Sequence, residues 1–415
     1  MKSLSVFLAA LMPGILVAAT GVGAGDLLTA GIAGSAFGVG ILWAAWSGAL
    51  TKYILNEGIA RWQMATGTTL IEGWRSHLGP WVTWPFSAYL CLWAFFVGGA
   101  LSGACGAAGA ALFPWPQDPS QARAFWGIVH ALVGFVIVRA GGFVWFERIM
   151  GICIGLMFAA VLTTAALLPP SPASFFEGLV FPEIPAGGGA WVIGVMGGVG
   201  GTVTLLSYGY WIREKGRHGA DGVKACRRDL AAGYLLSALF GLAMIVIGSR
   251  VSIVRSPSVV PDLAQQLEMA IGWPGRWVFL LGFWGAVFSS LLGVWQSAPK
   301  LFADLVTPRS SNGSPDPIRA RRHEFLFLTG ITLVPLPLLW IALQRAQLIY
   351  AIVGAAFLPF LALTLLIMNN RRQWMGKGFG NGWLANTGLA LTLIFFAAIG
   401  ISEATQAIAR LLRNF

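Results

Sequence analysis

Apolar runs of about 20 residues recur from one end of the chain to the other, and this pattern most limits what the chain can fold into. A run of that length spans the hydrocarbon core of a bilayer as an α-helix. Hydrophobic residues make up 57% of the 415 and charged residues only 10%, a balance that soluble domains do not have. The runs are continuous rather than alternating, which argues against a β-barrel. We therefore predict an all-α membrane protein built as one helical bundle.

The apolar runs define eleven predicted spans. They lie at about 5–38, 40–62, 82–112, 124–141, 146–169, 190–212, 230–250, 275–298, 325–343, 347–368 and 382–402. Proline-rich connections separate the fifth span from the sixth, at Pro169-Pro170-Ser171-Pro172 and Phe181-Pro182, where two halves of the chain would join.

The distribution of Lys and Arg predicts the orientation. With eleven spans and a cytoplasmic N-terminus, most basic residues fall in cytoplasmic loops, as membrane proteins prefer. The basic residues on the other side are Arg123, Arg250, Arg255, Arg276, Arg345, Arg410 and Arg413, and only Lys52 lies inside a span. The net charge of +11 thus reflects topology rather than nucleic-acid binding. We expect a plasma (inner) membrane protein with its C-terminus outside, and a monomer.

Two spans are interrupted by glycine. The first contains Gly21-Val22-Gly23-Ala24-Gly25-Asp26, and the sixth contains Gly197-Gly198-Val199-Gly200-Gly201. Lipid offers no partners for freed backbone groups, so such breaks survive only when packed in protein or lining a polar cavity. Paired breaks in two halves point to the substrate site of an inverted-repeat transporter. An acid at mid-membrane costs roughly 2.5–3.5 kcal/mol on insertion scales, so Asp26 is expected to face the cargo or ion path, to cap the second half-helix, or both.

Several short motifs in order along the chain resemble the NRAMP (natural resistance-associated macrophage protein) family. They are Met12-Pro13-Gly14, Ala33-Gly34-Ser35-Ala36-Phe37-Gly38, Arg61 with Ala65-Thr66-Gly67, Gly201-Thr202-Val203, Leu358-Pro359-Phe360 and Arg371-Arg372-Gln373-Trp374-Met375-Gly376. The resemblance implies a LeuT-like bundle of two inverted repeats, about 5–170 and 190–368, with an extra helix at about 382–402. It also implies transport of divalent metal cations by alternating access.

The chain departs from the family at the motifs that bind metal. Where the family has Asp-Pro-Gly-Asn in its first helix, this chain has Gly23, Ala24, Gly25 and Asp26. Where the family has Met-Pro-His-Asn in its sixth helix, this chain has Thr204, Leu205, Leu206 and Ser207, and a glutamine of the tenth helix is replaced by Phe357. The thioether and the proton-linked histidine are therefore missing, and the third span has no acid.

The remaining candidate ligands are all oxygen atoms. They are the Asp26 carboxylate, the hydroxyls of Thr204 and Ser207, and the main-chain carbonyls of Thr20, Gly23 and Gly201. Such a set suits hard ions such as Na⁺, Mg²⁺ or Mn²⁺, with Asp26 and Thr204 as the expected metal ligands. The alternative for the two hydroxyls is bonding back to the preceding helical turn.

Two further polar residues within spans have open interpretations. Lys52 is expected to pair with Glu57 near the inner end of its helix; the alternative is that it supplies a built-in positive charge opposite Asp26, in place of a coupling ion. His130 is expected to be a core histidine with satisfied hydrogen bonds; the alternative is a proton relay. Trp295 and Gln296, with Ser289 and Ser290, are candidates to line a cavity.

Together these features predict a secondary transporter of divalent cations with weak or absent proton coupling. The alternatives are a transporter of a small organic zwitterion or cation on the same fold, or a non-transporting membrane sensor. No catalytic constellation or Cys/His cluster is present. We therefore expect no enzyme, no resident cofactor and no nucleic-acid partner, only the bilayer and a small inorganic cation as cargo.

Overall fold

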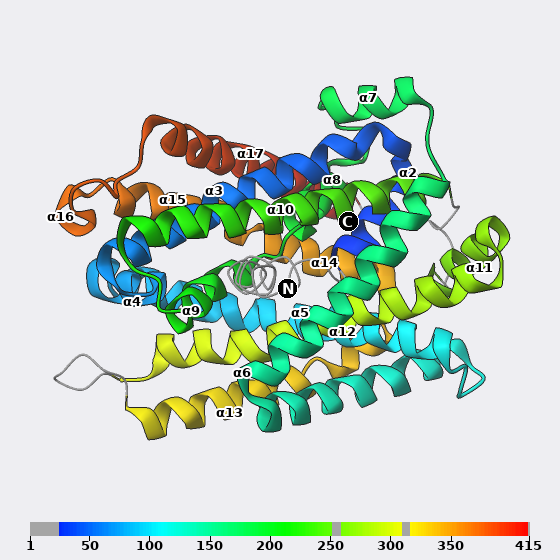
Figure 1. The fold of residues 1–415 in the computed structure, drawn as a ribbon, viewed down its shortest axis with the longest axis horizontal. Helices are drawn as coiled ribbons and strands as arrows, with labels where there is room; N and C mark the ends of the chain where they lie inside the picture. Colours follow the sequence, from blue (N-terminus) through cyan, green and yellow to red (C-terminus); the bar gives the residue numbers. More distant parts are fainter. Residues whose placement is uncertain (1–24, 251–258, 309–315, 414–415) are drawn as a thin grey trace, which may run out of the picture.

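The computed structural model describes residues 25–250, 259–308 and 316–413, and within these ranges it is helical, with no strand (Figure 1). Nine helical stretches in this part, some of them made of several consecutive elements, are long and apolar enough to cross a membrane. The all-α membrane bundle expected from the sequence is therefore confirmed.

The first half of the described chain contains both long helices and short turns. Its elements are η1 (Gly25–Ala30), α2 (Gly31–Phe37), η2 (Gly38–Ile41), α3 (Leu42–Thr66), α4 (Leu70–Gly73), η3 (Trp74–Leu78), α5 (Pro80–Leu112), α6 (Pro119–Leu167) and α7 (Pro172–Val180). Helix α7 belongs to the predicted connection between the two halves.

The second half begins with the predicted broken span. Its elements are α8 (Gly189–Gly198), η4 (Val203–Leu206), α9 (Ser207–Glu214), α10 (Gly219–Ser249), α11 (Val259–Ile271), α12 (Trp273–Val306), α13 (Pro317–Leu333), η5 (Leu336–Trp340), α14 (Leu343–Ala355), α15 (Phe357–Asn369), α16 (Arg372–Met375) and α17 (Trp383–Arg413). The last of these contains the predicted extra span at 382–402.

The predicted fourth and fifth spans form one helix, α6, rather than two separate ones. Figure 1 shows that α6 changes direction partway along its length. In its first arm His130 meets Trp284 of α12, and in its second arm Phe158 packs on Phe240 of α10. The two arms therefore contact different neighbours, as two spans would.

The predicted tenth span is also interrupted, whereas the sequence predicts a continuous helix there. Helices α14 and α15 meet at Ala356, whose N–H still bonds to the Ile352 carbonyl. Pro359 has no N–H to offer the Ala355 carbonyl four residues earlier. The helix therefore loses a hydrogen bond at this point.

Helix α3 approaches α8 so closely that only glycine fits between them. A Cβ atom on Gly48 would lie 2.8 Å from the Cα atom of Met196. Small residues of this kind allow membrane helices to bring their backbones together. Lys52 is one turn further along α3, so this contact places it beside the end of α8.

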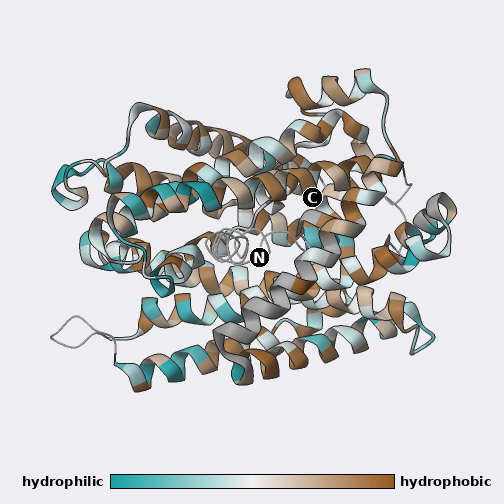
Figure 2. Cartoon of the chain, viewed as in Figure 1, coloured by the Kyte–Doolittle hydropathy of each residue, from teal (hydrophilic) through white to brown (hydrophobic). Residues whose placement is uncertain are grey.

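Basic residues from distant parts of the sequence gather at one end of the bundle. Arg61 donates to the carbonyl of Gly380 at 2.9 Å and to Asn381 at 2.7 Å, and Arg213 donates to Glu72 at 2.6 Å. Figure 2 shows hydrophilic residues concentrated around α4, α9, α16 and the start of α10. Arg61 and Arg213 both belong to the set of basic residues that the sequence predicts to be cytoplasmic.

Candidate functional site

The sixth span is broken in the middle, as its glycines predict. Helix α8 ends at Gly198, the segment from Val199 to Thr202 is not helical, and the chain resumes as η4 and α9. All residues from Val192 to Gly209 are buried. The broken backbone therefore lies inside protein rather than against lipid, which is the condition under which a membrane tolerates it.

Two adjacent glycines make the break possible. Gly200 has a φ of 78° and Gly201 a φ of 83°, a region in which side chains other than glycine are disfavoured. A Cβ atom on Gly200 would also lie 2.8 Å from Cε1 of Tyr234. Both the backbone conformation and the neighbouring ring therefore require glycine at this position.

The ammonium group of Lys52 fills the end of the broken helix. Its side chain is fully buried, and Nζ donates a hydrogen bond of 2.5 Å to the Gly197 carbonyl and another to the Val199 carbonyl. The last carbonyls of a helix lack partners within the helix and carry its partial negative charge. Lys52 therefore neutralises the C-terminal end of α8.

The expected pairing of Lys52 with Glu57 is wrong. Glu57 instead accepts from Arg61 at 2.7 Å and from Arg227 of α10 at 2.8 Å. The physical reason is helical spacing: Arg61 is four residues from Glu57 and shares its helix face, whereas Lys52 is five residues away. Lys52 thus faces the α8 break, and Glu57 faces α10.

A second layer of polar contacts encloses the break. Asn56, one turn after Lys52, donates to the Tyr234 hydroxyl at 2.9 Å, and the Tyr234 ring covers Gly200. On α5, Trp93 Nε1 donates to the Thr202 hydroxyl at 3.1 Å. Asn56, Trp93 and Tyr234 are not among the residues predicted from the sequence, although the four-residue spacing of Asn56 from Lys52 could have identified the first.

The predicted ligands of the sixth span lie at this break. Gly201, Thr204 and Ser207 are all buried, and the Ser207 hydroxyl has no hydrogen-bond partner among the described residues. The Thr29 hydroxyl of η1 likewise has none, and its methyl group lies against Gly194 of α8. Buried hydroxyls without partners are unusual in proteins, so this region has unused capacity to bind a polar ligand.

The other predicted ligands lie outside the part of the chain that can be described. These are Thr20, Gly23 and the side chain of Asp26, so their predicted roles stay predictions. The backbone at Gly25–Ala30 forms a π-helix, η1, that contacts α8. A π-helical turn often marks a functional segment within a longer helix. Phe357, at the family's glutamine position, is buried among other aromatic rings.

Two other predictions concern the α6–α12 interface. His130 Nδ1 lies 2.7 Å from the Trp126 carbonyl, and Trp284 Nε1 donates to His130 Nε2 at 2.9 Å. A neutral imidazole satisfies both contacts, because Nδ1–H donates to the Trp126 carbonyl while Nε2 accepts from Trp284, as expected of a core histidine. Trp295 and Gln296 line a cavity of about 370 Å³ that also contacts Arg139, Lys300, Arg321 and Glu324, whereas Ser289 bonds back to the Ala286 carbonyl.

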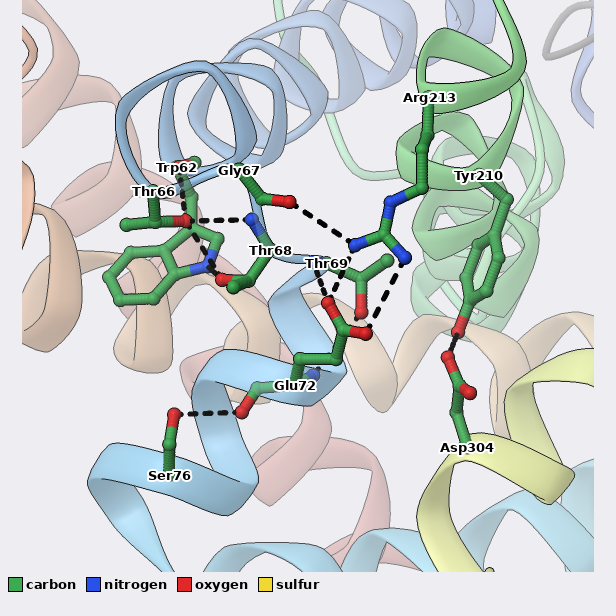
Figure 3. A network of polar contacts seen from close by, with 10 residues as sticks. All are labelled: Trp62, Thr66, Gly67, Thr68, Thr69, Glu72, Ser76, Tyr210, Arg213 and Asp304. Atoms are coloured by element: carbon green, nitrogen blue, oxygen red, sulfur yellow. Dashed lines mark hydrogen bonds and ion pairs between the residues drawn. The ribbon is translucent and has the colours of Figure 1, made fainter. Parts of the chain in front are cut away.

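A polar network joins three elements at the basic end of the bundle (Figure 3). Glu72 of α4 completes a capping box with Thr69 and accepts from Arg213 of α9 at 2.6 Å. The neighbouring Tyr210 of α9 donates to Asp304 of α12. This network ties the second half of the broken span to α4 and α12.

A buried ion pair reinforces the same end. Arg217, in the connection after α9, donates to Asp229 of α10 at 2.5 Å. Partial burial by itself would lower the pKa of the Arg217 guanidinium, but the Asp229 carboxylate, together with Cys226 and Tyr208, more than offsets this, so the pKa is raised above its ordinary value. Arg217 is therefore a permanent cation at this end.

Comparison with protein families gives a match over nearly the whole chain. Residues 14–404 match the family described as natural resistance-associated macrophage protein-like. No curated protein sequence matches.

Comparison with solved structures gives similar folds at low sequence identity. The Eremococcus coleocola manganese transporter, in complex with an aromatic bis-isothiourea substituted compound, is 16% identical, with a TM-score of 0.78 over 99% of this chain and 89% of that one. MhsT in complex with L-phenylalanine is 15% identical, with a TM-score of 0.62 over 94% and 98% of the two chains. MHP1, a nucleobase-cation-symport-1 family transporter, is 14% identical, with a TM-score of 0.57 over 96% and 93%. These likenesses confirm the predicted LeuT-like fold.

Proposed function

Because this chain belongs to the natural resistance-associated macrophage protein (Nramp) family, a family of secondary metal-ion transporters, we propose that it carries a hard divalent cation such as Mg²⁺ or Mn²⁺ by alternating access. We place the protein in the plasma (inner) membrane, with its N-terminus in the cytoplasm and its C-terminus outside. We propose that it has no resident cofactor. Proton coupling is proposed to be weak or absent.

The observation that carries the proposal is the buried break between α8 and η4. It combines two positive-φ glycines with the hydroxyls of Thr204 and Ser207 in a segment shielded from lipid. Hydroxyl and carbonyl oxygens are ligands for hard cations. Within the described ranges no three His, Cys, Asp or Glu side chains gather as they would around a softer transition metal. We propose Asp26 as the carboxylate that completes this oxygen set.

Lys52 affects what cargo the site accepts. A fixed ammonium at the end of α8 repels a dication nearby, and this repulsion is stronger in a buried site than in water. We therefore expect divalent cations to bind weakly. The same feature favours the second candidate, a small organic zwitterion, because its carboxylate would be attracted to the ammonium and to the N-terminal end of the second half-helix.

Flux into liposomes tests the proposal. The purified chain should admit Mn²⁺ or Mg²⁺ down a gradient, and Asp26→Asn and Thr204→Val should each reduce the initial rate by at least about tenfold, since each removes a proposed ligand. Asp221→Asn and Thr329→Val are matched controls, because Asp221 is exposed and Thr329 bonds only to its own helix at the Phe325 carbonyl.

A thermal-shift series separates the two cargo classes. Stabilisation by Mg²⁺ or Mn²⁺ and not by amino acids supports the divalent cation. Stabilisation by amino acids and not by metals supports the organic solute. Absence of both stabilisation and flux, from a folded protein, would contradict transport and favour the membrane sensor.

A further inference from the structure

The carbonyls at the end of α8 have an unusual set of partners. The Val195 carbonyl accepts from the Val199 N–H at 2.9 Å, and the Gly198 carbonyl accepts from the Gly201 N–H at 3.1 Å. The carbonyls of Gly197 and Val199 accept from the Lys52 ammonium. A side chain from another helix thus supplies the cation at the negative end of the broken helix.

This arrangement resembles an ion site more than a structural ion pair. Unwound carbonyls and half-helix C-terminal ends are the groups that coordinate small cations in broken-helix transporters. A buried ammonium is costly unless it is hydrogen-bonded, and here two main-chain oxygens accept from it. The nearby carboxylate Glu57 is engaged by Arg61 and Arg227.

The surroundings of Lys52 hold the ammonium in place. The Gly48–Met196 contact fixes α3 against α8 one turn away, and the stem of Lys52 lies 3.6 Å from where a Cβ of Gly200 would be. Asn56 and Tyr234 close the next turn of α3 against α10. The ammonium therefore lies at the end of a side chain that is enclosed between α3, α8 and α10.

We propose that the Lys52 ammonium is a tethered cation that occupies a monovalent-cation site formed by the Gly197 and Val199 carbonyls. The chain then needs no dissolved co-ion at this position. Removal of the Lys52 side chain should leave these two carbonyls free to bind a small inorganic cation or a primary ammonium ion. The consequence for coupling rests on the proposed transport function, whereas the existence of the site does not.

The test measures the thermal unfolding midpoint of the full chain in detergent at constant ionic strength. The salts compared are those of Na⁺, K⁺, methylammonium and choline. The wild-type midpoint should be the same in all four salts. Lys52→Ala should lower the midpoint in choline by on the order of 5 °C, because two buried carbonyls lose their donor. Na⁺ or methylammonium, but not the bulky choline, should restore at least half of that loss.

Two variants serve as controls. Lys224→Ala removes an exposed lysine paired only at the surface with Asp221, and its midpoint should stay within about 1 °C of wild type in every salt. Lys52→Arg keeps the cation and its donors, so it should be closer to wild type than Lys52→Met, and this comparison decides the matter if Lys52→Ala does not fold.

Three results would overturn the proposal. The first is a midpoint of Lys52→Ala that does not depend on the cation. The second is a wild-type midpoint that rises with Na⁺ as much as the variant does. The third is equal loss in Lys52→Arg and Lys52→Met. Because no flux is measured, failure of transport in liposomes leaves this result intact, and the two proposals fail separately.

Discussion

Gly200 and Gly201 carry the backbone through the break, and their substitution has a defined cost. Gly201→Ala should destabilise the protein by about 1–2 kcal/mol, because its φ of 83° is unfavourable for a residue with a Cβ atom. Gly200→Ala should cost more, since the new Cβ also meets Tyr234. Denaturant titration in mixed micelles measures both.

Gly330→Ala is the matched control for these substitutions. Gly330 lies inside α13 and has open space around it, so alanine there should leave stability unchanged or raise it by up to about 1 kcal/mol. Equal losses for Gly330→Ala and Gly201→Ala would show that the break does not depend on glycine conformation.

Glu57 is the residue whose charge we expect to matter most for stability. Glu57→Gln should cost about 3 kcal/mol, because the buried Arg61 guanidinium loses its carboxylate partner. Asp221→Asn, in the exposed pair with Lys224, should change stability by less than about 0.5 kcal/mol. Comparable values for the two variants in the same titration would contradict the described pairing.

At the level of helices, the network of Figure 3 joins α4, α9 and α12. Arg213→Gln should raise hydrogen–deuterium exchange of amides in α4 and α9 without unfolding the bundle, because the Glu72 ion pair is lost while the Thr69 capping box remains. Exchange should stay unchanged in α17, which lies away from this network (Figure 1). Unchanged exchange in α4 and α9 would mean that the pair does not hold these elements together.

The sequence was sufficient to predict most helices, since their apolar length and glycine breaks are local properties. The break at Gly200 and Gly201 was predicted for the same reason. The interruption at Ala356 was missed because a single proline inside an apolar run often leaves only a kink.

The partners of Lys52 were not predictable from local spacing. Its hydrogen bonds to Gly197 and Val199 depend on the approach of α3 to α8 at Gly48, a contact between residues far apart in the sequence. Glu57 likewise has a partner, Arg227, that comes from another helix, and its other partner, Arg61, shares its helix face at a spacing of four residues. Periodicity places residues on helix faces, and only tertiary packing decides what those faces meet.

For the whole molecule, the gathering of basic residues predicts which end faces the cytoplasm. In a Cys91→Ser background, Gln117→Cys should react with a membrane-impermeant maleimide applied to intact cells, and Lys377→Cys should react only after the membrane is opened. The reason is that Lys377 lies on the side rich in Lys and Arg, which membrane proteins retain inside. The reverse labelling pattern would invert the proposed orientation.

Anomalous diffraction from crystals soaked in Mn²⁺ will show whether a hard cation binds where the sixth span unwinds. We expect one anomalous peak at the break, within coordination distance of the Thr204 hydroxyl and the Gly201 carbonyl, that is lost in Asp26→Asn. A peak only at the exposed acids, or no peak at the break in crystals saturated with Mn²⁺, would contradict it.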